Sequence, residues 1–147
     1  MTRAQIREDI FKLLFRIEFN SVEDMPSQIA HFFDNPQMGE DGEDGDCRIG
    51  EQDMQYITQK YEQIVNRIPE LDALIDSAAK GWKSSRLGKV DLTILRLAVY
   101  EMKYDEDIPV GVAINEAVEL AKKFGQDESP SFINGILAKL AKSADDE

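Results

Sequence analysis

Residues 107–125 read DIPVGVAINEAVELAKKFG, and this stretch decides the fold. Pro109 suits the first turn of a helix, because proline lacks the N–H that the first turn leaves unpaired. Gly125 suits the left-handed position at which many helices end. Between them, apolar residues recur with the spacing of one helix face, and the alanines among them allow a second helix to pack closely. The residues of this face are Ala113, Ile114, Ala117, Val118, Ala121 and Phe124.

Two polar neighbours, Asn115 and Glu116, interrupt this apolar run. Consecutive residues of a helix point about 100° apart, so this pair cannot act as a general acid and base on one substrate. An architectural role is favoured, and we expect Asn115 to hydrogen-bond a neighbouring backbone end. Glu119 is placed to pair with Lys122 or Lys123 on the surface.

The last predicted helix follows in SPSFINGILAKLA, residues 129–141. Ser129 is predicted to be its N-cap and Pro130 its first helical residue. Gly135 lies inside this helix, where glycine costs about 1 kcal/mol relative to alanine. This cost predicts that another helix passes very close to Gly135. The apolar residues in helical register are Phe132, Ile133, Ile136, Leu137 and Leu140.

A period of about 3.6 residues extends through every other long segment, and none of them alternates as a strand does. The fold class is therefore all-α, with about seven helices in two small packed bundles. We expect a single domain, with an N-terminal bundle over about residues 1–79 and a C-terminal bundle over about residues 80–142. Asp91 is predicted to be the N-cap of the fifth helix. The earlier helices are predicted over about residues 3–17, 22–34 and 51–67, and from Pro69 onward.

The charge of the chain is unevenly distributed. Its 29 acidic residues against 17 Lys and Arg give a net charge of −12, which at first disfavours a nucleic-acid partner. However, residues 34–53 alone carry a local charge of −7, whereas residues 80–103 carry +4. The acidic segment contains a loop over about residues 35–50, rich in Gly and Asp, which breaks the helical period. It is not a phosphate loop, because no strand precedes it and no Lys-Ser/Thr follows.

Cys47 and His31 are the only residues of their kinds. An internal disulfide is therefore impossible, and a Cys/His metal cluster is excluded. Acidic neighbours disfavour the Cys47 thiolate, and no nucleophile motif surrounds His31. No apolar run approaches the roughly 20 residues of a membrane span, and the N-terminus is unlike a signal peptide. We expect a cytoplasmic protein that is not an enzyme and uses no metal or other cofactor.

Three motifs carry a specific resemblance: KVDLTILRLAVYEM in residues 89–102, IPVGVAINEAVELAKKFG in residues 108–125, and SFINGILAKLA in residues 131–141. In this order and spacing they resemble the NusB family of bacterial transcription antitermination factors. IREDIFKLLFRIEF, residues 6–19, resembles the first helix of that family. The resemblance runs through almost the whole chain and implies an all-helical fold of two small bundles.

The same resemblance implies a function and partners. Members of the family bind the boxA sequence of nascent RNA and pair with NusE, which is also a protein of the small ribosomal subunit. The complex helps RNA polymerase to resist termination, notably on ribosomal RNA operons. Family contacts to RNA come from an arginine-rich first helix, an aromatic residue on it, and an aromatic residue at the start of the last helix. By motif position these correspond to Arg3, Arg7, Phe15 and Phe132.

Two features of this sequence bear on the RNA contacts that the resemblance implies. The stretch TRAQIRED, residues 2–9, has only two arginines, and Phe15 stands where a tyrosine is common, so weak RNA binding without the partner protein is expected. The basic connection KGWKSSRLGK, residues 80–89, is expected to add phosphate contacts through Lys83, Arg86 and Lys89.

The residues themselves also support this interpretation. Binding of single-stranded RNA needs cations for phosphates and flat side chains for bases, and a strip of Arg3, Arg7, Phe11 and Phe15 offers both. From periodicity alone, an alternative is favoured in which both phenylalanines are core and the arginines are solvated. The resemblance assigns Phe15 to RNA and leaves Phe11 in the core.

Three other functions compete with this interpretation of the sequence. A NusB-like domain is attached to some ribosomal RNA cytosine methyltransferases, but this sequence lacks the Gly-rich strand-to-helix turn that would hold a methyl donor. A stand-alone enzyme lacks a nucleophile motif, a metal cluster and paired carboxylates. A helical adaptor that binds only proteins stays open, and binding of boxA RNA with and without NusE would separate it from an RNA-binding factor.

Overall fold

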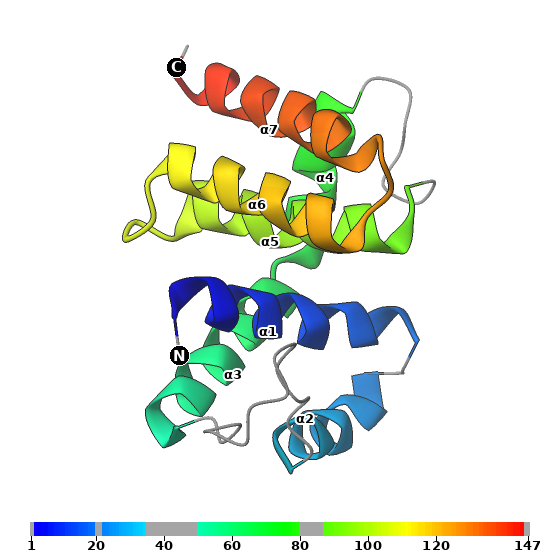
Figure 1. The fold of residues 1–147 in the computed structure, drawn as a ribbon, viewed down its shortest axis with the longest axis vertical. Coiled ribbons are helices and arrows are strands. Elements are labelled where there is room, and N and C mark those ends of the chain that lie inside the picture. The colour runs from blue at the N-terminus through cyan, green and yellow to red at the C-terminus, as the bar shows by residue number, and fades with distance from the viewer. Residues whose placement is uncertain (1, 20–21, 35–49, 80–86, 146–147) are drawn as a thin grey trace. The chain divides into compact units, whose positions relative to one another are not determined.

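The computed structural model describes residues 2–19, 22–34, 50–79 and 87–145, and all regular structure within this part is helical (Figure 1). The predicted all-α class with about seven helices is confirmed. The predicted acidic loop lies outside the described residues except for Gly50, and so does Cys47. The α-helices are α1 (Arg3–Phe15), α2 (Met25–Asp34), α3 (Glu51–Val65), α4 (Ile68–Ala78), α5 (Lys89–Tyr104), α6 (Val110–Phe124) and α7 (Ser129–Asp145), with short 3₁₀ helices η1 (Arg16–Glu18) and η2 (Val22–Asp24).

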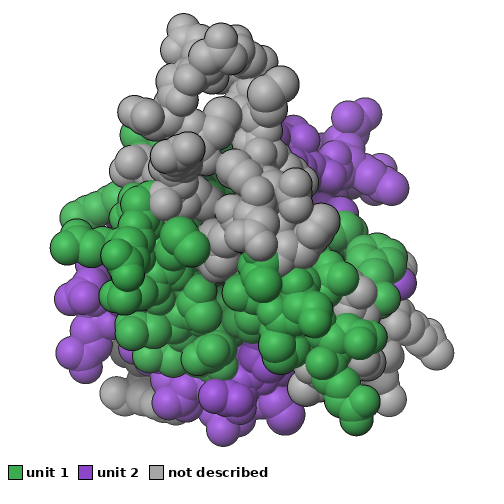
Figure 2. Space-filling view, turned by 90° about the horizontal axis from the view of Figure 1, so that it is seen from below, with its two compact units in different colours: residues 1–63 green, residues 64–147 purple. Residues whose placement is uncertain are grey.

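The chain forms two compact units, residues 1–63 and residues 64–147 (Figure 2). This division falls earlier than the expected boundary near residue 79. Helix α4 packs against α5 and α7 and therefore belongs to the second unit. The amphipathic pattern of α4 marks a buried face but does not say which helices cover it, so the sequence alone could not assign α4 to a bundle.

In the second unit, α5, α6 and α7 pack on one another, and α4 covers part of α5 and α7 (Figure 1). Ala113, Ala117 and Ala121 of α6 are buried, which confirms the predicted close-packing face. That face is narrower than predicted, because Ile114 and Val118 are only half-buried.

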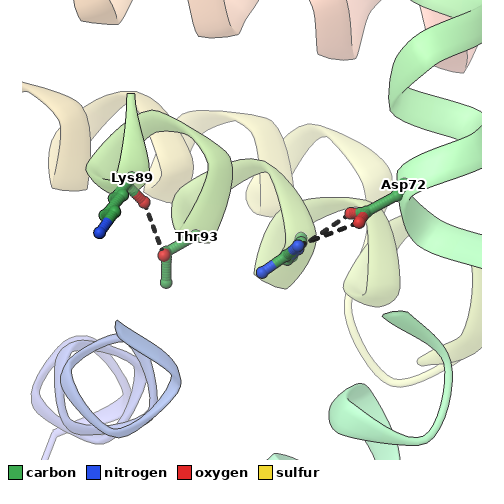
Figure 3. Close-up of polar contacts among 4 residues, drawn as sticks. Asp72, Lys89 and Thr93 are labelled. Atoms are coloured by element: carbon green, nitrogen blue, oxygen red, sulfur yellow. Dashed lines mark hydrogen bonds and ion pairs between the residues drawn. The ribbon is translucent and has the colours of Figure 1, made fainter. Parts of the chain in front are cut away.

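An ion pair joins α4 to α5. Arg96 donates from Nε to Asp72 Oδ1 and from Nη2 to Asp72 Oδ2, each at 2.9 Å. In Figure 3 both carboxylate oxygens of Asp72 face the guanidinium. This two-point geometry is the strongest arrangement for a carboxylate and an arginine, and it fixes the register of the two helices.

In the first unit, α1 begins with a capping box. Thr2 Oγ1 accepts from the Gln5 N–H at 3.1 Å, and Gln5 Oε1 accepts from the Thr2 N–H at 2.8 Å. At the other end, Arg16 Nη1 donates to the carbonyl and the side-chain oxygen of Gln28, at 3.2 and 3.1 Å. These bonds tie η1 to α2. The buried apolar residues of this unit are Ile10, Phe11, Leu13, Leu14, Met25, Ile57 and Tyr61.

The starts of α5 and α7 differ from the predictions. The N-cap of α5 is Gly88 and not Asp91, since the Leu92 N–H donates to the Gly88 carbonyl at 2.9 Å. Asp91 lies in the first turn, where its charge suits the helix dipole equally well, so composition could not distinguish the two positions. Ser129 is the first residue of α7 and not its cap. Its Oγ instead accepts from the Gln126 N–H at 3.0 Å and closes the preceding turn.

Gly125 ends α6, but the predicted left-handed conformation is wrong. Its φ is −91° and its ψ −169°, an extended backbone that other residues also adopt. The position favours glycine for a different reason: a Cβ there would lie 2.7 Å from the Cβ and Oγ of Ser129 and 2.8 Å from the Ala121 carbonyl oxygen. Pro109 is the N-cap of α6, one position before the first turn.

Two further predictions are corrected by α6 and α7. No described atom outside the local chain lies within 4 Å of the place where a Cβ on Gly135 would stand, so no helix of this part of the protein passes close to it. Asn115 is exposed, and its amide makes no hydrogen bond to a described residue. The predicted Glu119 to Lys122 pair is present at 3.3 Å.

Candidate nucleic-acid interface

The predicted basic residues of α1 differ in exposure. Arg3 is exposed in the first turn, directly after the Thr2 cap. Arg7, one turn later, is only 8% exposed. Residues four apart on a helix are offset by about 40°, so one turn is enough to move a side chain from the exposed to the buried side. Arg3 is therefore the cation of α1 that solvent and a phosphate reach most readily.

Three phenylalanines continue along the same flank. Phe11 and Phe15 are stacked with ring centroids 6.0 Å apart, and Phe15 meets Phe19 edge to face at 5.1 Å. Phe11 is buried, Phe15 is half-buried, and Phe19 is 61% exposed. The assignment of Phe11 to the core is confirmed. Phe19 was missed as an accessible aromatic residue, although its spacing of four from Phe15 was the signal that could have found it.

Acidic groups modulate the charge of α1. Glu8 pairs with Lys12 at 3.3 Å, which partly neutralises that lysine. Burial raises the pKa of the Asp9 carboxyl to about 6 from an ordinary value of 3.8, against a smaller opposing effect of Lys12. A fraction of Asp9 is therefore protonated just below neutral pH, and the helix is then less negative than its sequence suggests.

The other predicted site residues belong to the second unit. Phe132 is half-buried in the first turns of α7, and Lys89 is exposed at the start of α5. The Lys89 carbonyl accepts from the Thr93 hydroxyl at 2.7 Å, within the first turn of α5 (Figure 3). Lys83 and Arg86 lie outside the described residues.

These features suit binding rather than catalysis. An exposed guanidinium offers a charge for phosphate, and half-exposed rings offer faces for unpaired bases. In the described part of the chain, no group of three or more His, Cys, Asp or Glu is arranged to hold a metal ion. None of the helices in that part combines the length and apolar character that crossing a membrane requires.

Comparison with known proteins extends over nearly the whole chain. The sequence profile of the NusB family matches residues 4–142. Transcription antitermination protein NusB of Agathobacter rectalis is 49% identical over 144 residues, which covers 96% of this chain and 100% of that protein. The protein of the same name from Lachnoclostridium phytofermentans is 43% identical over 140 residues, covering 95% and 98%.

Solved structures share the fold. The structure of T. maritima NusB superposes with a TM-score of 0.80 at 32% identity, covering 97% of this chain and 92% of that one. A crystal structure of antitermination factors NusB and NusE in complex with dsRNA contains a chain with a TM-score of 0.72 at 24% identity, a likeness of fold. Given the match of the family profile and the identity of the two relatives along their length, this chain belongs to the NusB family of transcription antitermination proteins, which are not enzymes.

Proposed function

We propose that this protein binds boxA-containing RNA together with NusE, and thereby supports the antitermination complex of RNA polymerase on ribosomal RNA operons. The observation that carries the proposal is the membership of residues 4–142 in the NusB family. A structural relative has been crystallised with NusE and dsRNA, which supports both kinds of partner. The net charge of −12 favours a partner protein that helps to hold the RNA, because this chain alone repels phosphate at long range.

The RNA contacts in this proposal are Arg3, Arg7 and Phe15 of α1, Phe132 of α7 and Lys89 of α5, with Lys83 and Arg86 of the basic connection. Arg3 and Lys89 are exposed, so both can neutralise a phosphate. Phe15 and Phe132 are half-buried, an exposure that leaves part of each ring for a base while the rest is anchored. Arg7 is included among the proposed RNA contacts because it lies one turn after Arg3 on α1.

A titration of labelled boxA RNA tests the proposal. Fluorescence anisotropy would be recorded with this protein alone, with NusE alone, and with both. We expect weak binding by the single protein and binding at least tenfold tighter when both are present. A scrambled RNA of equal length controls for unspecific charge effects. If this protein binds NusE but never increases affinity for boxA over the scrambled RNA, it is a protein-binding adaptor.

A further inference from the structure

Phe19 is the most exposed large apolar side chain among the described residues, at 61%. Single apolar residues on a protein surface are common and need no special explanation. Phe19 differs from such residues, because it ends a row of three rings that begins at the buried Phe11 and passes through the half-buried Phe15. The row carries aromatic surface from the core of the first unit out to solvent.

The backbone and its neighbours hold Phe19 in place. Phe19 is the C-cap of η1, and its N–H donates to the Arg16 carbonyl at 3.1 Å. Arg16 is itself anchored, because its Nη1 donates to the carbonyl and the side-chain oxygen of Gln28 at 3.2 and 3.1 Å. The edge contact with Phe15 supports the ring of Phe19 from one side. A ring that is already ordered loses less conformational entropy when a ligand stacks on it.

The angle between the rings of Phe15 and Phe19 indicates which kind of ligand they fit. Their planes are inclined by 69°, and their centroids lie 5.1 Å apart. Two bases that stack on these rings, one on each, would be inclined by a similar angle and could not stack on each other. Single-stranded RNA can splay neighbouring bases in this way and stack them on aromatic side chains. A duplex cannot, because its bases stay stacked.

The charge of this segment favours RNA over the chain as a whole. Residues 3–19 hold four basic residues against three acidic ones, a balance of +1 in a chain of net charge −12. Arg16 lies three residues before Phe19, and residues three apart in a 3₁₀ turn lie on the same side. A guanidinium near an exposed ring can attract the phosphate next to a stacked base.

We propose that Phe19 is a second base-stacking position, beside Phe15, and that the two rings splay two successive bases of a single-stranded RNA. The base on Phe19 is held at an angle to its neighbour on Phe15. Phe19 then contacts RNA itself and does not act only by supporting the ring of Phe15. The proposal rests on the proposed function, because it requires RNA bound along α1.

The test begins with three variants of Phe19. Phe19→Ala removes the ring, Phe19→Leu keeps apolar bulk without a flat face, and Phe19→Tyr keeps the ring. Tyr56→Ala removes an exposed ring from α3 of the same unit and serves as the matched control. Most of the Phe19 ring lies in solvent, so its loss should leave the fold intact. Thermal melting checks this for every variant.

Affinity for boxA RNA would be measured by anisotropy in the presence of NusE. We expect Phe19→Ala and Phe19→Leu each to weaken binding at least about fivefold, the lower end of what a stacked base contributes. Phe19→Tyr and Tyr56→Ala should stay within twofold of the parent. Parent-like affinity of folded Phe19→Ala would overturn the proposal. Parent-like affinity of Phe19→Leu would also overturn it, because a flat face would then be unnecessary.

A second experiment distinguishes a base on Phe19 from mere support of Phe15. A set of boxA RNAs, each with one abasic nucleotide, would be titrated with the parent, Phe19→Ala and Phe15→Leu, which keeps apolar bulk against Phe11. Removing a base costs less affinity in the variant that already lacks its ring. We expect this cost to disappear at one nucleotide in Phe19→Ala and at the adjacent nucleotide in Phe15→Leu.

The same nucleotide for both variants would mean that Phe19 only positions Phe15, which overturns the proposal. An undiminished cost at every nucleotide in Phe19→Ala would overturn it as well. If Phe19→Ala weakens NusE binding measured by calorimetry without RNA, the ring contacts protein, and the stacking assignment is wrong while the proposed function stands. If the parent with NusE binds boxA no more tightly than scrambled RNA, the proposed function itself fails, and the stacking position fails with it.

Discussion

Phe19 packs edge to face against Phe15, with ring centroids 5.1 Å apart and ring planes inclined by 69°. On its other side Phe15 stacks on the buried Phe11. The ring of Phe15 is thus held between a core ring and a surface ring. A base that stacks on its free part meets a ring whose orientation is already fixed, which reduces the entropy cost of binding.

Phe15→Ala should therefore lower the affinity of the protein and NusE together for boxA RNA by about 1 to 3 kcal/mol, the usual contribution of a stacked base. Phe15→Tyr should retain most of the affinity because it keeps the ring. Anisotropy measures both. Circular dichroism must show that Phe15→Ala is folded, since it also removes contacts with Phe11. Tyr56→Ala, at an exposed aromatic position of α3, is the control. An equal loss in the alanine and tyrosine variants of Phe15 would argue against stacking.

Arg3→Ala should flatten the dependence of RNA affinity on salt. Each phosphate neutralised on a single strand contributes about 0.7 to the slope of log K against log salt concentration, because its counterion is released. Titrations at several salt concentrations would show the slope reduced by about that amount. Lys142→Ala makes the same change of charge at an exposed position of α7 and should leave the slope closer to the parental value. Arg7 is a poorer test, because its burial couples binding to folding.

Phe132→Ala should weaken RNA binding by about 1 to 3 kcal/mol with almost no change in that slope, because a phenyl ring carries no charge. The contrast with Arg3→Ala separates stacking from phosphate contacts within one set of titrations. Phe132 is half-buried, so a melting curve is needed to show that the variant is folded. If Phe132→Ala also strongly reduced the dependence of affinity on salt, the substitution would have disrupted phosphate contacts as well as stacking.

Asp9→Asn should stabilise the protein at neutral pH. Burial raises the pKa of Asp9 to about 6, so the folded state keeps this proton at pH values where the unfolded state has lost it. The contribution of Asp9 to stability therefore falls as pH rises from about 4 to 6 and stays low above that. Since the group is partly solvated, the gain is on the order of 1 kcal/mol.

Urea titrations at pH 4.5 and pH 7.5 would measure this effect as a difference between variant and parent. The difference should be larger at pH 7.5. Asp107→Asn makes the same substitution at an exposed position in the turn before α6 and is the matched control. Equal effects of Asp9→Asn at both pH values would mean that the amide acts through packing and not through charge.

The residues that follow a helical period were predicted well, because a buried face repeats in the sequence. The alanine face of α6 was found in this way, and so was the core position of Phe11. The burial of Arg7 was not predicted, because Arg7 lies at the edge of the apolar stripe, where periodicity does not decide burial. Phe19 follows η1, past the end of α1, so its spacing of four from Phe15 was the signal for its place beside that ring.

Polar and glycine positions were harder to predict for a physical reason. Asn115 suits a backbone hydrogen bond and an open groove equally well, and only the placement of α7 distinguishes the two. Glycine is compatible with a left-handed turn, with close approach or with open space. Gly125 and Gly135 of this chain represent the second and the third of these cases.

These two glycines should respond in opposite ways to the same substitution. Gly125→Ala would place a Cβ 2.7 Å from Ser129 and 2.8 Å from the Ala121 carbonyl, so the turn between α6 and α7 must shift, at a cost of about 1 to 3 kcal/mol. Gly135→Ala meets nothing within 4 Å and removes a helix-interior glycine, which should stabilise the protein by about 1 kcal/mol. Urea titrations of both variants at one pH give the two changes in free energy of unfolding. A loss of stability in Gly135→Ala would contradict this prediction, because it would mean that the added Cβ meets a neighbouring group.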